Sequence, residues 1–120
     1  MTNEPAPVLD PAQVADLFSL DQGKGALFAK FIGVFFDTAP ERMLKIKALA
    51  QYGNLAGLAE SAHSLRGAAG NVGAARFSVL LERIELAARG GDTITAAQEV
   101  TLLDTEFSAA RAALLAATNP

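Results

Sequence analysis

Alanine and leucine, the two strongest apolar helix formers, occupy 41 of the 120 positions. Together with the other apolar residues they recur at steps of three and four, the spacing of one face of an α-helix. Aromatic residues make up only 7% of the chain, and this scarcity of strand-forming side chains disfavours a β-rich fold. A chain of this length is expected to form one domain. The sequence therefore predicts an all-α domain over residues 10–120, preceded by a flexible leader over residues 1–9.

A helix start signal precedes the first apolar stretch. Asp10 can cap a helix, Pro11 suits its first position, and Gln13 can reach back to complete a capping box. The pattern predicts a short helix over about 11–19.

The second apolar face extends over Phe28–Leu49 and contains Pro40. Thr38–Glu41 could be a capping box that opens a new helix, or the proline could kink a continuous one. Because the apolar face stays in phase across Pro40, we expect one long kinked helix that ends at Tyr52–Gly53.

Three further helices are expected. The first begins after the cap Asn54 and ends at Gly70–Gly73. The second spans Phe77–Ala88 and ends at Gly90–Gly91. The third begins at a capping box, Thr95–Gln98, and continues unbroken to Ala117. Short connections between amphipathic helices favour antiparallel neighbours. We expect an antiparallel up-down-up-down four-helix bundle, with the short N-terminal helix covering one end.

Composition excludes several kinds of site. Without cysteine and with one histidine, neither a disulfide framework nor a zinc site can form. The net charge of −3 gives no support for nucleic-acid binding, and no apolar stretch reaches the roughly 18–20 residues of a membrane span. The chain also lacks the glycine-rich P-loop of an ATP-using enzyme. We expect a cytoplasmic protein that binds neither nucleic acid nor membrane.

The single histidine lies on the third expected helix. At about 100° per residue, His63 points about 130° away from the centre of that helix's apolar stripe, so we expect it to face solvent. Its neighbours at one and two turns, Ala59, Gly67 and Gly70, are all small, and Arg66 lies three positions later. A glycine inside a helix costs about 1 kcal/mol relative to alanine. Gly67 therefore indicates that space is kept open beside the imidazole of His63. The guanidinium of Arg66, next to it, is suited to binding an anionic group.

The segment Ala62–Ala74 closely resembles the signature of the histidine-containing phosphotransfer (HPt) domain family. That signature has a histidine, a basic residue three positions later, a glycine at four and another glycine six positions further on. Here these positions hold His63, Arg66, Gly67 and Gly73, and the resemblance extends over nearly the whole chain. Arg66 is a departure, because the family more often has lysine there, but the positive charge is kept.

The resemblance implies a phosphorelay intermediate of two-component signal transduction, and not an autonomous kinase. Nε2 of His63 would accept a phosphoryl group from the aspartyl phosphate of a receiver domain and pass it to another receiver, while Arg66 would stabilise the phosphoryl oxygens. The residues expected to meet the docked receiver are Ala59, Glu60, Ser64, Gly67 and Gly70. The protein is expected to be a monomer without cofactor or metal of its own, since any Mg²⁺ would be bound by the receiver.

Other charged residues leave alternatives open. Glu60 could accept a hydrogen bond from the second imidazole nitrogen, and Arg76 and Arg83 could rim the phosphate site. The basic segment Lys24–Lys47 could steer an acidic receiver surface, although a solvated helix face is the more usual interpretation of such a segment. The alternative function is a non-catalytic helical adaptor, which would dock receivers without phosphoryl transfer.

Overall fold

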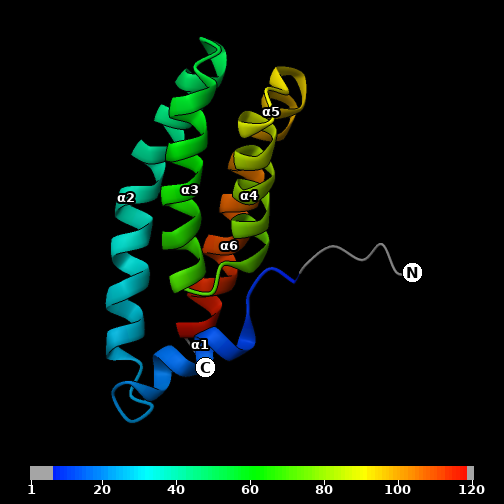
Figure 1. Cartoon of the computed structure of the whole chain (residues 1–120). Coiled ribbons are helices and arrows are strands. Elements are labelled where there is room, and N and C mark those ends of the chain that lie inside the picture. The colour runs from blue at the N-terminus through cyan, green and yellow to red at the C-terminus, as the bar shows by residue number, and fades with distance from the viewer. Residues whose placement is uncertain (1–6, 119–120) are drawn as a thin grey trace, which may run out of the picture.

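The computed structural model describes residues 7–118, and these residues form six helices and no strand. The helices are α1 (Pro11–Ser19), α2 (Ala26–Gln51), α3 (Leu55–Asn71), α4 (Ala75–Arg89), α5 (Thr93–Val100) and α6 (Leu103–Thr118). In Figure 1, α2 and α4 run upward, α3 and α6 run downward, and α1 crosses the lower end. The all-α prediction is confirmed.

Helix α1 begins as predicted, with one difference. Asp10 Oδ1 accepts hydrogen bonds from the backbone N–H groups of Ala12 and Gln13. Gln13 does not complete a capping box: its side-chain Nε2 donates instead to the carbonyl oxygen of Asn71, 2.9 Å away at the end of α3. The capping-box prediction for Gln13 is therefore wrong, and this side chain ties α1 to the α3–α4 turn.

The leader prediction concerns residues 1–9, of which residues 1–6 lie outside the described part of the chain. Val8 and Leu9 contact the domain: the Val8 carbonyl oxygen accepts from the backbone N–H of Arg76 at 3.3 Å, and Leu9 packs against the core. These two residues belong to the fold and not to a free leader.

Helix α2 is continuous through Pro40, which confirms one long helix in preference to two. Thr38 does not cap a new helix, because its Oγ1 donates to the carbonyl oxygen of Val34 one turn earlier. The buried residues of α2 lie on both sides of the proline, with Phe35 before it and Met43 after it. Burial of one unbroken apolar face accounts for the continuity.

The C-terminal helix is broken, contrary to prediction. Helix α5 starts at Thr93, because Asp92 and not Thr95 is its cap: Asp92 Oδ1 accepts from the Thr95 N–H at 3.0 Å. The helix ends at Val100, and a turn at residues 101–102 leads into α6. Thr101 Oγ1 donates to the Gln98 carbonyl oxygen at 2.6 Å, a local bond that competes with helix continuation.

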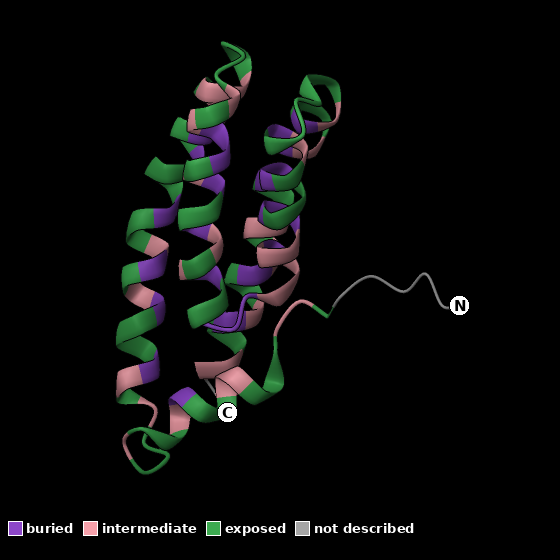
Figure 2. Cartoon of the chain, viewed as in Figure 1, coloured by how far each residue is buried: buried purple, intermediate pink, exposed green. Residues whose placement is uncertain are grey.

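The core fixes the helix that carries the histidine. Buried residues face the inside of the bundle in Figure 2, and four inward side chains of α3 have no exposed surface: Leu58, Ala62, Leu65 and Ala69. Phe35 of α2, Phe77 of α4 and Phe107 of α6 form an aromatic cluster with ring centroids 5.6–6.2 Å apart. Close packing on this side holds the outward face of α3 in place.

Gly73 in the α3–α4 turn is a structural glycine, and we expect Gly73→Ala to destabilise the fold by about 2–3 kcal/mol. Its φ is +82°, and a Cβ there would lie 2.9 Å from Val14 Cγ2 of α1. Gly91→Ala is the matched control, because Gly91 has φ +75° but no atom within 4 Å of the added Cβ. Urea unfolding should show a smaller loss for the control, about 1 kcal/mol. Equal losses would mean that the α1 contact contributes nothing.

Candidate functional site

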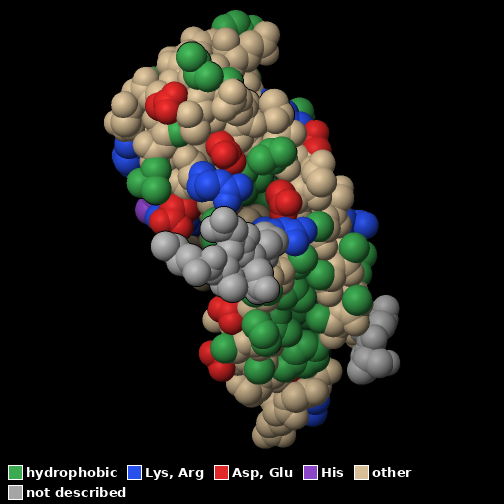
Figure 3. Space-filling model, turned by 90° about the vertical axis from the view of Figure 1, so that its right-hand side faces the viewer, with side chains coloured by type: hydrophobic (Ala, Val, Ile, Leu, Met, Phe, Trp, Pro, Cys, Tyr) green, Lys and Arg blue, Asp and Glu red, His purple; other side chains and the backbone are tan. Residues whose placement is uncertain are grey.

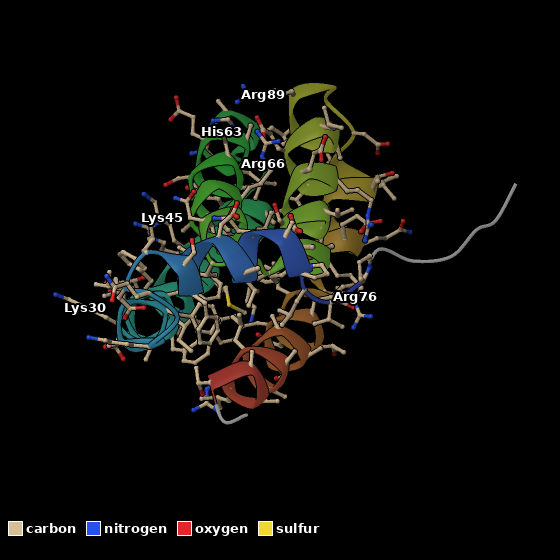
Figure 4. The ribbon with its side chains drawn as sticks, turned by 90° about the horizontal axis from the view of Figure 1, so that it is seen from below. Lys30, Lys45, His63, Arg66, Arg76 and Arg89 are labelled. Atoms are coloured by element: carbon tan, nitrogen blue, oxygen red, sulfur yellow. The ribbon has the colours of Figure 1, made fainter. Side chains whose placement is uncertain are left out.

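His63 lies in the middle of α3 with its side chain 58% exposed, which confirms that it faces outward. Figure 4 shows His63 and Arg66 on the same side of the bundle, with Arg89 of α4 beyond them. The inward residues of α3 are buried, so the packing of the core sets the outward direction of the imidazole.

One ring nitrogen of His63 is held by the protein. Its Nδ1 lies 3.1 and 3.2 Å from the two carboxylate oxygens of Glu85 on α4. Arg66 Nη2 lies 2.9 Å from the same Nδ1 and 3.4 Å from Glu85 Oε1. Within residues 7–118, no hydrogen bond engages Nε2. The arrangement therefore presents Nε2 outward and anchors the ring through Nδ1.

The two contacts to Nδ1 correspond to different tautomers of the imidazole. When Nδ1 carries the proton, it donates to Glu85 and leaves the lone pair on Nε2. When Nε2 carries the proton, Nδ1 accepts from Arg66 and the exposed nitrogen has no lone pair to offer. A carboxylate acceptor makes the first a charge-assisted hydrogen bond. Glu85 thus favours the tautomer in which Nε2 is a nucleophile.

Glu85 is a buried carboxylate, only 7% exposed, surrounded by positive partners. Nε and Nη2 of Arg89, one turn later on α4, both lie 2.9 Å from Glu85 Oε2. Burial alone would raise the pKa of Glu85, but hydrogen bonds from Arg89 and His63 and the nearby charges outweigh it and lower the pKa below its ordinary value. The group is therefore an anion at neutral pH and can accept a proton-bearing nitrogen.

Sequence reasoning missed Glu85 and assigned its role to Glu60. Glu60 makes no hydrogen bond to His63 and lines a hollow on the opposite side of the imidazole, toward α2. A signal for Glu85 was present: it lies among the apolar positions of α4, between Ile84 and Ala88, which are both buried. A carboxylate on a buried stripe needs a partner, and here the partners are His63 and Arg66 of α3 and Arg89 of α4 itself.

The predicted docking residues divide into exposed and buried ones. Ala59 is only 2% exposed, so its assignment to the docking surface is wrong: it packs in the core. Gly67 and Gly70 lie on the exposed face, and a Cβ on Gly67 would meet no atom within 4 Å. Ser64 is also exposed and lines the same hollow as Glu60. Space beside the imidazole is thus open at Gly67.

Arg76 and Arg83 do not rim the site. Arg76 Nε lies 2.6 Å from Glu106 of α6, and Arg83 Nε lies 3.0 Å from Glu99 of α5. Figure 4 places Arg76 far from His63. The prediction that they could border the phosphate site is wrong, and Arg89 is the second arginine near His63.

Residues 7–118 contain neither a metal-binding cluster nor a membrane-spanning helix. No three histidine, aspartate or glutamate side chains come together there in a way that could hold a metal ion. Likewise, none of the helices there combines the length and apolar character needed to cross a membrane.

The chain matches known proteins at two levels. The sequence matches the family model described as Hpt domain over residues 30–113. The fold is similar to the crystal structure of histidine-containing phosphotransfer protein B (HptB) from Pseudomonas aeruginosa PAO1, with a TM-score of 0.82, 25% sequence identity, and coverage of 94% of this chain and 96% of that one. No curated protein sequence matches. The family model spans most of α2, all of α3, α4 and α5, and most of α6, and on this match the chain belongs to the Hpt domain family.

Proposed function

We propose that this protein is a phosphorelay intermediate that accepts a phosphoryl group on His63 from the aspartyl phosphate of one receiver domain and passes it to another. The observation that carries the proposal is the arrangement of the ring: Nδ1 faces a buried carboxylate at 3.1 Å, whereas Nε2 has no hydrogen-bond partner within residues 7–118 and the side chain is 58% exposed. A histidine that only stabilised the fold would have no need for this arrangement. The scaffold is an antiparallel up-down-up-down bundle that leaves this face of α3 uncovered.

The chemistry is a direct displacement at phosphorus. The Nε2 lone pair forms the N–P bond while the P–O bond to the receiver aspartate breaks and the aspartate leaves as a carboxylate. The proton on Nδ1 stays there, and the anionic Glu85 stabilises the positive charge that develops on the ring. Because the transition state is loose, positioning and charge placement carry the catalysis. Attack by a second receiver's aspartate reverses these steps and frees His63.

The protein in this proposal is a phosphoryl carrier and not a kinase. It acts as a monomer in the cytoplasm, with no cofactor of its own. Any Mg²⁺ that the transfer requires is bound by the receiver domain. Receivers of response regulators or hybrid histidine kinases are the partners.

The test uses the fact that the chain contains one histidine. Receiver domains from the same genome are phosphorylated with labelled acetyl phosphate and mixed with the protein. Phosphohistidine is labile in acid and stable in base, so label with that behaviour that is absent from a His63→Gln variant lies on His63. Transfer supports the relay. Binding of receivers without acid-labile label would overturn it and leave the adaptor function.

Arg66→Ala is expected to slow transfer about 10- to 100-fold at saturating receiver. Its guanidinium lies 2.9 Å from the imidazole, close enough to reach the oxygens of a phosphoryl group at the ring, and alanine removes that charge. Arg66→Lys is the matched variant and should restore most of the rate, since lysine keeps the charge. Rapid-quench measurement of labelled phosphate gives the rates. An unchanged rate in the alanine variant would remove Arg66 from the mechanism.

Gly67→Ala is expected to stabilise the free protein and to impair transfer. The alanine methyl group has open space around it, so the helix gains about 1 kcal/mol, or roughly 4 °C in melting temperature. The same methyl group would hold a docking partner away from His63 and slow transfer about tenfold.

Gly33→Ala on α2 is the control for Gly67→Ala, because its added Cβ also meets no atom. It should give a similar stabilisation and leave transfer unchanged. If Gly67→Ala transfers as fast as the wild type, the open space at Gly67 does not serve docking.

A further inference from the structure

The positive side chains of the described residues fall into two groups. Six are engaged: five pair with carboxylates, and Arg111 lies over the ring of Phe36 at 5.4 Å. The five that pair with carboxylates are Lys47, Arg66, Arg76, Arg83 and Arg89. Four have no ion pair within residues 7–118, and all four lie on α2 or just before it: Lys24, Lys30, Arg42 and Lys45. Although the chain is acidic overall, its unpaired positive charge is concentrated on one element.

Two of these unpaired cations line a hollow close to the histidine. Arg42 and Lys45, one turn apart on α2, face Glu60, Ser61 and Ser64 of α3 across a hollow of about 270 Å³, which we call the α2–α3 pocket. Ser64 directly follows His63 in the chain. Figure 4 shows Lys45 on the same side of the bundle as His63.

The chemistry of the α2–α3 pocket suits an anionic group. Two cations and two hydroxyl groups line it against a single carboxylate, Glu60. An incoming carboxylate would therefore meet a net positive charge and hydroxyl donors. The opposite face differs: in Figure 3 acidic and basic side chains lie next to one another around α4 and α5, as expected from the Arg83–Glu99 pair.

The α2–α3 pocket shares one lining residue, Arg42, with an apolar groove. This groove of about 610 Å³ lies between α1, α2 and α3. Phe31 and Val34 of its wall are 40% and 56% exposed. A surface that offers apolar side chains next to an acidic one would cover both hollows, whereas a free small anion would leave the groove empty. The occupant that fits is a folded protein surface.

We propose that the α2–α3 pocket determines which receiver domain docks, by accepting an acidic side chain of the receiver between Arg42 and Lys45. This proposal rests on the proposed function. The receiver would then be held on both sides of the imidazole: by the pocket on the α2 side, and by Arg66 at the phosphoryl group on the α4 side. Charge in the pocket also speeds encounter with an acidic surface.

Charge reversal tests the proposal. The probe is the receiver domain that transfers fastest to the wild-type protein, held in its active form with beryllofluoride. At low ionic strength, Arg42→Glu and Lys45→Glu should each raise its Kd about tenfold or more, and added salt should reduce the difference. The transfer rate at saturating receiver should stay within about twofold of wild type.

Lys24→Glu is the matched control, because it makes the same change of charge at an unpaired lysine outside both hollows. Its Kd should stay within about twofold of wild type. An equal rise in Kd for all three variants would show that only net charge matters. A lower saturating rate with unchanged Kd would place Arg42 and Lys45 in the chemistry. Either result overturns the pocket proposal.

Failure of the proposed function is distinguishable from failure of the pocket. If no receiver transfers to wild-type His63, the same variants are measured with whichever receiver binds most tightly. Binding that depends on Arg42 and Lys45 would support the docking role of the α2–α3 pocket and overturn the phosphorelay function. Binding that is indifferent to them, or no binding by any receiver, would overturn both.

Discussion

A His63→Gln variant is expected to accept no phosphoryl group from any receiver while it keeps its fold. Glutamine has no ring nitrogen with a basic lone pair, and the chain has no second histidine. The polar contacts of the imidazole are through Nδ1 with Glu85 and Arg66, and its side chain is 58% exposed. Glu85 remains paired with Arg89 and Arg66 in the variant, so no buried charge is left alone. The free energy of unfolding should change by less than about 0.5 kcal/mol.

The measurement is acid-labile label after incubation with a phosphorylated receiver, followed over the time in which the wild type is fully labelled. Receiver affinity, measured with the beryllofluoride form, should stay within about threefold of wild type, since the docking contacts lie around the imidazole and not only on it. Label on the variant at the wild-type level would show that the phosphoacceptor is a residue other than His63. Loss of binding together with loss of label would assign His63 to docking.

The sequence predicts helices well and their ends less well. Pro40 does not break α2, and the in-phase apolar face predicted this, because burial along one stripe outweighs one missing backbone hydrogen bond. The same reasoning failed at the α5–α6 turn. Val100 and Leu103 are both buried on either side of the turn, so the three-residue spacing persists across a break in the helix. The features that end α5, such as the Thr101 side-chain bond, leave no mark on periodicity.

In the site, the sequence predicts which residues lie close together on one helix, but not which residues of two different helices meet. His63 and Arg66 are three residues apart on one helix, so their proximity follows from the helical repeat. Glu85 is 22 residues from His63 on another helix, and periodicity predicts which face is buried but not how two helices align along their axes. The choice of Glu60 shows this limit: it lies one turn from His63 in sequence, yet it lines the hollow on the α2 side.

Glu85→Leu is expected to lower the transfer rate about 10- to 100-fold, by loss of the acceptor that orients His63. Leucine cannot accept the Nδ1 proton, so the tautomer with the proton on Nε2 becomes more populated and the exposed nitrogen loses its lone pair. The ¹⁵N spectrum of the single imidazole reports this directly. We expect the Nδ1–H form to dominate in the wild type and to decline in the variant. An unchanged tautomer ratio with a slow rate would mean that Glu85 does not act through the tautomer of His63.

Glu85→Gln removes the charge of this residue but keeps its shape. The difference in the free energy of unfolding between wild type and this variant is expected to depend on pH. The pKa of Glu85 is lowered in the folded protein from an ordinary value of 4.5. The carboxylate therefore stabilises the fold at pH values above about 4.5, and this contribution is lost as the pH falls through the lower, folded pKa. The amide does not titrate, so the free-energy advantage of wild type over Glu85→Gln should shrink between about pH 6 and pH 3. Urea unfolding across this range measures it; an advantage that stays constant or grows toward acid would show that the carboxylate is not stabilised by Arg89, His63 and Arg66.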